Sequence, residues 1–97
     1  MGTLAFLDDD ALFDGSCVRF TGTDGGETVV CGVTTAALQS GDPGLPHLGL
    51  VPAEAFLETY RKLMIRIHDI ARMKYQNREF EGDGPIRIMV HRRDLVP

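Results

Sequence analysis

Residues 16–33 read SCVRFTGTDGGETVVCGV, two runs of alternating character on either side of a glycine pair. Successive side chains of a strand point to opposite faces, so this alternation predicts two strands that each have one apolar face. Gly25 and Gly26, which follow Thr23 and Asp24, tolerate the positive φ of a tight hairpin. The stretch therefore predicts an antiparallel hairpin. Its apolar face is expected to carry Val18, Phe20, Val29, Cys31 and Val33.

The pairing of the two strands follows from their apolar residues. We expect Gly22 to pair with Glu27, which brings Phe20 opposite Val29. In this register the apolar faces of the two strands coincide. The same register leaves the two cysteines of the chain on opposite faces, which argues against a disulfide bond between them. In a reducing cytoplasm we expect two buried thiols instead.

A long helix is predicted from Pro52 to Gln76, because proline suits the first turn of a helix and the residues after it repeat with helical spacing. Its core side is expected to carry Phe56, Leu57, Tyr60, Leu63, Met64, Ile67, Ile70 and Ala71. The opposite side carries Glu58, Arg61, Lys62, Arg66, Asp69 and Arg72. His68 is expected at the edge of the apolar side. Ile65 and Met73 fall among the charged residues, where water is expected.

The remaining segments complete a two-layer fold. They are a first strand at residues 3–7, a short helix from Thr34 or Thr35 to Gln39, a loop at 40–51 and a last strand at 86–91. We expect an α+β fold with a four-stranded, mainly antiparallel sheet, in the order β-β-β-α-α-β along the chain, covered on one face by the long helix. Besides the hairpin residues, the covered face is expected to carry Phe6, Ile86, Ile88 and Val90. At 97 residues the chain fits a single domain, residues 1–97.

The same residues resemble a known family. The matching positions are Phe6 with Asp8, Phe13-Asp14, Val18-Arg19-Phe20, Asp24-Gly25, Val30-Cys31, Leu38, Phe56, Arg61, Ile67, Ile70-Ala71, Lys74-Tyr75 and Asp94-Leu95. They are spaced much as in a family of small proteobacterial proteins known as domain of unknown function 1488. The resemblance implies a compact α+β fold of unknown activity, and it offers no catalytic residues to carry over.

No motif of a catalytic, cofactor or metal site is present in the sequence. The acidic segment around Asp10 and Asp14 fails the EF-hand pattern, because Leu12 stands where a third-position oxygen ligand is needed. Metal-ligand spacing is also missing among the histidines, which are His47, His68 and His91. We expect a protein with no cofactor and no enzymatic activity.

Charge is unevenly distributed along the chain. Residues 1–60 carry nine acidic side chains and one basic side chain, and residues 61–97 carry nine basic and five acidic ones, within a net charge of -4. The first residues lack an export signal, and the apolar runs are too short to cross a bilayer. We expect a soluble, cytoplasmic protein with no membrane partner.

Two surface features carry the functional expectation. Apolar residues in water-facing positions are candidate contacts with a protein partner. Ile65 and Met73 are expected on the polar side of the long helix, and Val30 and Met89 on the outer face of the sheet. Because the two halves of the chain have opposite charge, a homodimer is one such partnership. The candidate anion contacts are Arg61, Arg66, Arg72, Arg92 and Arg93. Our preferred function is a non-catalytic protein-interaction or accessory protein. The alternative is a nucleic-acid-associated protein that uses the basic C-terminal half.

Overall fold

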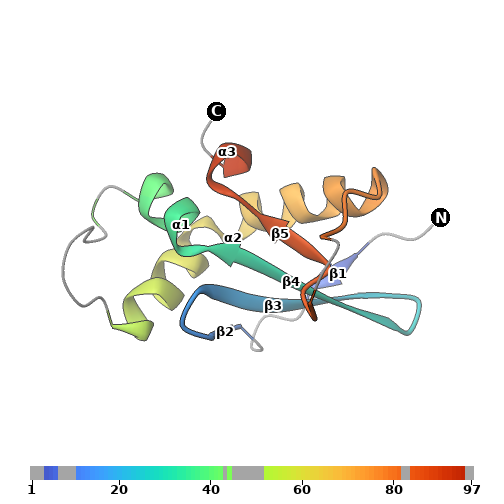
Figure 1. The fold of residues 1–97 in the computed structure, drawn as a ribbon, viewed down its shortest axis with the longest axis horizontal. Helices are drawn as coiled ribbons and strands as arrows, with labels where there is room; N and C mark the ends of the chain where they lie inside the picture. The colour runs from blue at the N-terminus through green and yellow to red at the C-terminus, as the bar shows by residue number, and fades with distance from the viewer. Residues whose placement is uncertain (1–3, 7–10, 43, 45–51, 82–83, 96–97) are drawn as a thin grey trace.

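The structure is a computed structural model that describes residues 4–6, 11–42, 44, 52–81 and 84–95. Along the chain its elements are β1 (Ala5–Phe6), β2 (Leu12–Phe13), β3 (Cys17–Asp24), β4 (Glu27–Thr34), α1 (Thr35–Gly41), α2 (Ala53–Gln76), β5 (Ile88–Val90) and α3 (Arg92–Leu95). Figure 1 shows α2 running diagonally across the sheet. The predicted α+β fold, with a long helix packed on a sheet, is confirmed.

The hairpin of β3 and β4 turns more tightly than the sequence analysis predicted. Asp24 pairs with Glu27, and residues 25–26, both glycine, have φ of 57° and 98°. Two residues with positive φ form a turn whose twist matches the strands, so the pairing extends two residues further. The predicted pairing of Gly22 with Glu27 is wrong, because Gly22 faces Val29. A shift of two residues leaves every side chain on its predicted face.

Among the described residues, the sheet contains one more strand than predicted. Its order is β1-β3-β4-β5, and β2 also pairs with β3. Strand β2 has only two residues, which is too short for an alternating pattern to reveal it. Strand β5 runs parallel to β4, since the crossover through α1 and α2 returns the chain to the same end of the sheet. The other described strand pairs are antiparallel, as expected for a mainly antiparallel sheet.

The core lies between the sheet and the three helices. From the sheet it takes Val18, Phe20, Val29, Cys31, Val33, Ile88 and Val90, all of them predicted inner-face residues. From α2 it takes Phe56, Tyr60, Ile67 and Ala71. The predicted core residues Phe6, Leu57, Leu63, Met64 and Ile70 are partly buried and pack against this cluster. Helical and strand periodicity therefore identified both sides of the core, except that Ile86, also predicted on the inner face, is only partly buried and lies outside this cluster.

Helix α1 extends beyond its predicted end. Thr34 is its N-cap, and the threonine hydroxyl accepts a hydrogen bond from a backbone N–H of the first turn. The helix continues to Gly41, so the predicted loop at 40–51 begins later than expected. A Cβ at Gly41 would lie 2.8 Å from Leu63 and 3.0 Å from Leu95, which explains why glycine suits this end of the helix.

Some predictions lie partly or wholly outside the described residues. The first strand was predicted at residues 3–7, and within it the structure describes 4–6, with β1 at Ala5–Phe6. His47, Asp8, Asp9, Asp10 and most of the predicted loop lie outside the described ranges. The last strand narrows from 86–91 to Ile88–Val90. Within the described residues, no helix is both long and apolar enough to cross a membrane.

Candidate interaction surface on helix α2

The side of α2 that faces away from the sheet exposes apolar residues to water. Ile65 is 78% exposed and Met73 is 59% exposed, the two highest values among the large apolar side chains of the described residues. Charged side chains surround both of them. We name this set the outward face of α2, and its members are Glu58, Arg61, Lys62, Ile65, Arg66, Asp69, Arg72 and Met73.

One arginine of the outward face is fixed in place by its own chain. The Nη1 of Arg72 forms an ion pair of 3.0 Å with Asp69, and its Nε donates a hydrogen bond of 3.1 Å to the carbonyl of Leu4. Its guanidinium also lies 5.1 Å from the centre of the Phe6 ring. Arg72 therefore ties β1 to α2, a structural role that the prediction of an anion contact did not include.

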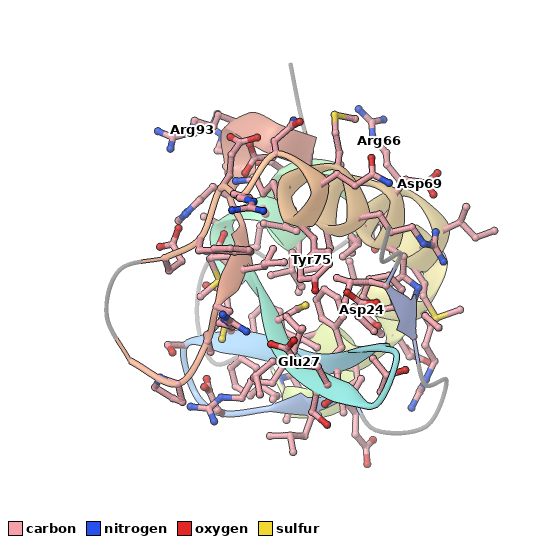
Figure 2. All side chains as sticks on the ribbon, turned by 90° about the vertical axis from the view of Figure 1, so that its right-hand side faces the viewer. Asp24, Glu27, Arg66, Asp69, Tyr75 and Arg93 are labelled. Atoms are coloured by element: carbon pink, nitrogen blue, oxygen red, sulfur yellow. The ribbon has the colours of Figure 1, made fainter. Side chains whose placement is uncertain are left out.

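The other bases of the outward face are more exposed. Lys62 lies 3.6 Å from the Asp42 carboxylate at the end of α1. Arg61 and Arg66 form no ion pair within the described part of the chain, and both side chains are exposed. Figure 2 shows Arg66 and Asp69 together on α2, pointing away from the sheet. Arg61 and Arg66 are therefore available for contacts with another molecule.

The face of the sheet that no helix covers, which we call the open face, has its apolar residues partly buried among neighbouring side chains of the sheet. Val30 and Met89, the two contacts predicted there, are both partly buried. A Cβ at Gly32 would lie 3.1 Å from the Met89 sulfur and 3.3 Å from the Cys17 sulfur. The Met89 side chain thus packs over the bare backbone of Gly32. Of the two predicted partner surfaces, the outward face of α2 exposes more apolar surface.

Arg92 and Arg93 lie apart from the bases of the outward face of α2. Both are exposed on α3, beside an open hollow of about 570 Å³ that is also lined by Thr34, Ala36 and His91. Figure 2 shows Arg93 well separated from Arg66. The five predicted anion contacts therefore lie on two separate surfaces, because α3 packs against α1 and, through the pair of Asp94 with Lys74, against the inward side of α2.

A second hollow, of about 500 Å³, lies where the C-terminal end of α2 meets the hairpin turn. The hydroxyl of Tyr75 donates a hydrogen bond of 2.5 Å to the Asp24 carboxylate, and Figure 2 shows these two side chains next to each other. Arg87 pairs with Glu27 at 2.8 Å and stacks on the ring of Phe80. These groups mainly bind one another and join α2, the hairpin and the segment before β5.

The chemistry of this hollow agrees with a structural role. The hydrogen bond to Asp24 raises the pKa of Tyr75 above its ordinary value, and burial and the nearby carboxylates raise it further. A phenol with a raised pKa stays protonated at neutral pH, where it acts as a hydrogen-bond donor. Tyr75 is therefore poorly suited to act as a base or nucleophile.

A partly buried ion pair that the sequence analysis missed lies on the inward side of α2. The side chain of Lys74 is 11% exposed and lies 2.8 Å from the Asp94 carboxylate of α3, which is 20% exposed. Asp94 also accepts a hydrogen bond from the His91 backbone N–H. Lys74 follows Ile67 and Ala71 on the core side at helical spacing, so this position could have been recognised from the sequence.

His68 is buried at the core, which corrects its predicted place at the edge of the apolar side. It is 7% exposed, and its Nε2 shares a hydrogen bond of 2.7 Å with the Tyr60 hydroxyl. The Phe6 ring stacks on the imidazole with a centroid distance of 4.1 Å. Helical periodicity cannot reveal this burial, because β1 supplies the covering ring from a distant part of the sequence.

Neither a metal site nor a reactive thiol is found among the described residues. Among the described residues, no three side chains of His, Cys, Asp or Glu gather as metal ligands. Cys17 and Cys31 are both buried, as predicted. Burial raises the pKa of the Cys17 thiol, and the neighbouring Asp14 carboxylate raises it further, so this thiol is a weak nucleophile at neutral pH.

Comparison with known proteins identifies the family. The profile described as "Protein of unknown function (DUF1488)" matches residues 4–88, which is most of the chain. The chain belongs to the DUF1488 family. A crystal structure of a DUF1488 protein of unknown function from Shewanella loihica PV-4 is similar in fold, with a TM-score of 0.72, 19% sequence identity and 91% of each chain covered. No curated protein matches the chain in sequence.

The family assignment confirms the resemblance noted in the sequence. At 19% identity, the solved DUF1488 structure supports the fold alone. The match to the DUF1488 profile ends at Ile88, so α3 and its two arginines lie beyond the matched residues. The outward face of α2 lies wholly inside them.

Proposed function

We propose that this DUF1488 protein is a non-catalytic protein-interaction protein that binds its partner through the outward face of α2. The observation that carries the proposal is the 78% exposure of Ile65 in the middle of a long helix. A single exposed apolar residue is common on protein surfaces. Here Met73, 59% exposed, adds a second one on the same side of the same helix.

The stability of the isolated chain does not account for Ile65. A side chain that remains mostly in water gains little from the hydrophobic effect. Isoleucine is also a weaker helix former than alanine, leucine, lysine or glutamate, so it adds little to α2 itself. A partner that covers Ile65 would remove its apolar surface from water, and this gain supports an interaction at this position.

The non-catalytic part of the proposal is supported by how the polar groups are used. In the hollow beside the hairpin, Tyr75 is bound to Asp24 and Arg87 to Glu27. Active sites keep a nucleophile or base available to a substrate. Groups that bind one another across three segments of chain are better suited to holding those segments together.

A nucleic-acid role remains the alternative. The exposed guanidinium groups of Arg61 and Arg66 favour it, since they could neutralise phosphates. Arg72 is already held by Asp69 and β1, and Arg93 lies elsewhere on the molecule. A protein partner therefore fits the outward face of α2 better than a nucleic acid does.

We also infer a cytoplasmic location. Cys17 and Cys31 are both buried and form no disulfide. Cysteines that stay as thiols are typical of reducing compartments, where disulfides rarely persist. This supports the location without depending on the interaction at α2.

The test is a photo-crosslinking residue placed at position 65 of the full chain, in cells that make the protein. We expect adducts that protease digests and nuclease leaves intact. The photo-crosslinking residue in place of Val30 tests the open face of the sheet. In place of Thr28, an exposed position of the hairpin, it is the matched control. Adducts digested by nuclease would favour the nucleic-acid alternative. Equal crosslinking at 65 and 28, or none at 65, would overturn the proposal.

A further inference from the structure

The charged residues of the outward face are arranged symmetrically about Ile65. Glu58 lies seven residues before Ile65 and Arg72 seven after it, while Arg61 lies four before and Asp69 four after. At about 100° per residue, these five positions form one stripe about 80° wide. Each of the five side chains is exposed except Arg72, which is partly exposed.

We infer that the partner of the outward face is a second copy of this chain, docked with the two α2 helices antiparallel and with Ile65 against Ile65 of the second copy. This inference rests on the proposed function, because it names the partner for the same surface. A two-fold interface must be complementary to itself: where one residue contacts a second residue of the other copy, that second residue contacts the first in return, and only a residue on the axis meets its own counterpart. The stripe centred on Ile65 satisfies this requirement.

Antiparallel pairing about Ile65 joins opposite charges along the stripe, whereas Arg66 lies about 100° round the helix from Ile65 and outside the stripe. A residue n positions after Ile65 then faces the residue n positions before Ile65 in the second copy. Asp69 faces Arg61, and Arg72 faces Glu58, so the dimer contains each pairing twice. Lys62 is next to Arg61 and adds a second base near Asp69. Complementary charges across an interface select one partner and one register.

Other arrangements of the same two helices join like charges. A parallel pair in register would place Glu58 against Glu58 and every other charge against itself. An antiparallel pair centred on Asp69 would match Ile65 with Met73, the two most exposed apolar residues. It would also place Asp69 against Asp69 and Arg66 against Arg72, which repel. The register centred on Ile65 avoids both conflicts.

One partner group is already oriented for this contact. Arg72 is held by Asp69, the Leu4 carbonyl and the Phe6 ring. A guanidinium has five N–H donors, so these contacts leave donors for a carboxylate of the second copy. Because the side chain is fixed before binding, little of its conformational freedom is lost when Glu58 of the second copy approaches.

The expected dimer is weak and depends on salt. α2 has 24 residues and is about 36 Å long. One pair of such helices buries less than the roughly 1,600 Å² of a standard interface, so the complex belongs to the transient class. Exposed charge pairs are screened by salt, and the dimer should therefore dissociate as ionic strength rises.

A charge swap tests the pairing of Arg61 with Asp69. Sedimentation equilibrium of the purified full chain at low salt should show a dimer, and Arg61→Glu alone should raise its dissociation constant by about tenfold or more. Asp69→Arg alone should weaken it similarly, because each change makes two like-charge contacts. A mixture of the two variants should form a heterodimer with recovered affinity. The glutamate introduced in one chain then faces the arginine introduced in the other, and the native pair of Asp69 with Arg61 remains at the second contact. Arg93→Glu, with the same change of charge on α3, should dimerise like the unmodified chain.

A disulfide test reads the register without depending on charge. Ile65→Cys should form a disulfide-linked dimer under mild oxidation, because residues at a two-fold axis come within the roughly 7 Å that a disulfide requires. Met73→Cys should not, since eight residues from the axis it lies about 24 Å along the helices from its own copy. The native cysteines are buried and do not compete.

The outcomes separate this inference from the function on which it rests. A monomer at low salt up to about 1 mM would overturn the inference. The inference would also be overturned if the mixture of Arg61→Glu and Asp69→Arg dimerised no more tightly than either variant alone. Equal formation of disulfide-linked dimers by Ile65→Cys and Met73→Cys would overturn it as well. If crosslinking in cells at position 65 still captures a different protein, the proposed function stands without a homodimer. If position 65 captures nothing and the chain is a monomer, both are wrong.

Discussion

Two isoleucines of α2, two residues apart, have opposite surroundings. Ile67 is 0% exposed and lies in the core between the helix and the sheet, whereas Ile65 is 78% exposed on the outward face. Residues two apart on a helix point to nearly opposite sides. The same side chain therefore stabilises the fold at one position and contributes almost nothing to it at the other. Stability explains Ile67, and Ile65 needs another explanation.

The polar residues of the two sides differ in the same way. On the inward side, Lys74 and His68 are buried, and each is held by a short contact to Asp94 or Tyr60. On the outward side, Arg61 and Arg66 stand in solvent with no ion pair to the described residues. Burial makes an unpaired polar group costly, and exposure does not. Arg61 and Arg66 are thus free to contact a partner.

The largest expected effect comes from the buried isoleucine. Ile67→Ala should lower the free energy of unfolding by about 3 kcal/mol, because it removes buried methyl groups and leaves a cavity. Urea unfolding followed by circular dichroism measures this loss. The matched change Ile65→Ala, at low protein concentration, should lie within about 0.5 kcal/mol of the unmodified chain. Similar losses at both positions would mean that the two sides of α2 do not differ as described.

A smaller loss is expected at the ion pair of the inward side. Asp94→Asn leaves the Lys74 ammonium, 11% exposed, without its carboxylate partner. A fully buried charge left unpaired costs more, but these side chains keep some contact with water, so we expect about 1–2 kcal/mol. Equilibrium unfolding at neutral pH measures it. A neutral result would place Lys74 in solvent in the native protein.

The same pair gives a pH dependence of known sign. Burial alone would raise the pKa of Asp94, but the hydrogen bonds from Lys74 and from the His91 N–H outweigh it and hold the pKa below its ordinary 3.8. A carboxyl with a lowered folded pKa stabilises the protein above its unfolded pKa and loses this contribution as the pH falls through the folded value. The unmodified chain should therefore lose more stability than Asp94→Asn below about pH 4.

Sequence periodicity predicted what depends on local pattern. The hairpin faces, the core side of α2 and the exposure of Ile65 all follow from repeats of two or about 3.6 residues. The predicted hairpin register differs from the observed one by two residues. Both registers place the same side chains on each face, so only the geometry of the turn distinguishes them. The two-residue turn with positive φ at both glycines decides it.

Contacts between segments far apart in the chain could not be predicted from the sequence. His68 is buried because Phe6 stacks on it, and Arg72 is held because the Leu4 carbonyl reaches it. Both contacts depend on where β1 pairs in the sheet. The five candidate anion contacts shared a charge and a region of sequence, but α2 carries three of them and α3 two, and Figure 2 shows Arg93 of α3 well away from Arg66 of α2. Nearness along the chain did not predict nearness in space.

Removing the hydroxyl of Tyr60 should have a moderate effect. Tyr60→Phe keeps the ring in the core and deletes the hydrogen bond of 2.7 Å to His68. The net value of one such bond is about 1 kcal/mol, and the loss should be close to it. Thermal and urea unfolding both report the change. An unchanged stability would indicate that another group replaces the hydroxyl as partner of the imidazole.

The smallest expected effect, and the one that separates the two sides of α2 most clearly, is that of Ile65→Ser on the dilute protein. Serine and isoleucine have similar helix propensity, and Ile65 has little contact to lose, so the free energy of unfolding should change by less than about 0.5 kcal/mol. At higher concentration the result should differ. If α2 pairs with a second copy, the melting temperature of the unmodified chain rises with protein concentration, because binding stabilises only the folded state. For Ile65→Ser this rise should be absent or much reduced. A loss above about 1 kcal/mol in dilute solution would mean that Ile65 packs within the single chain, and its exposure would then no longer support an interaction site.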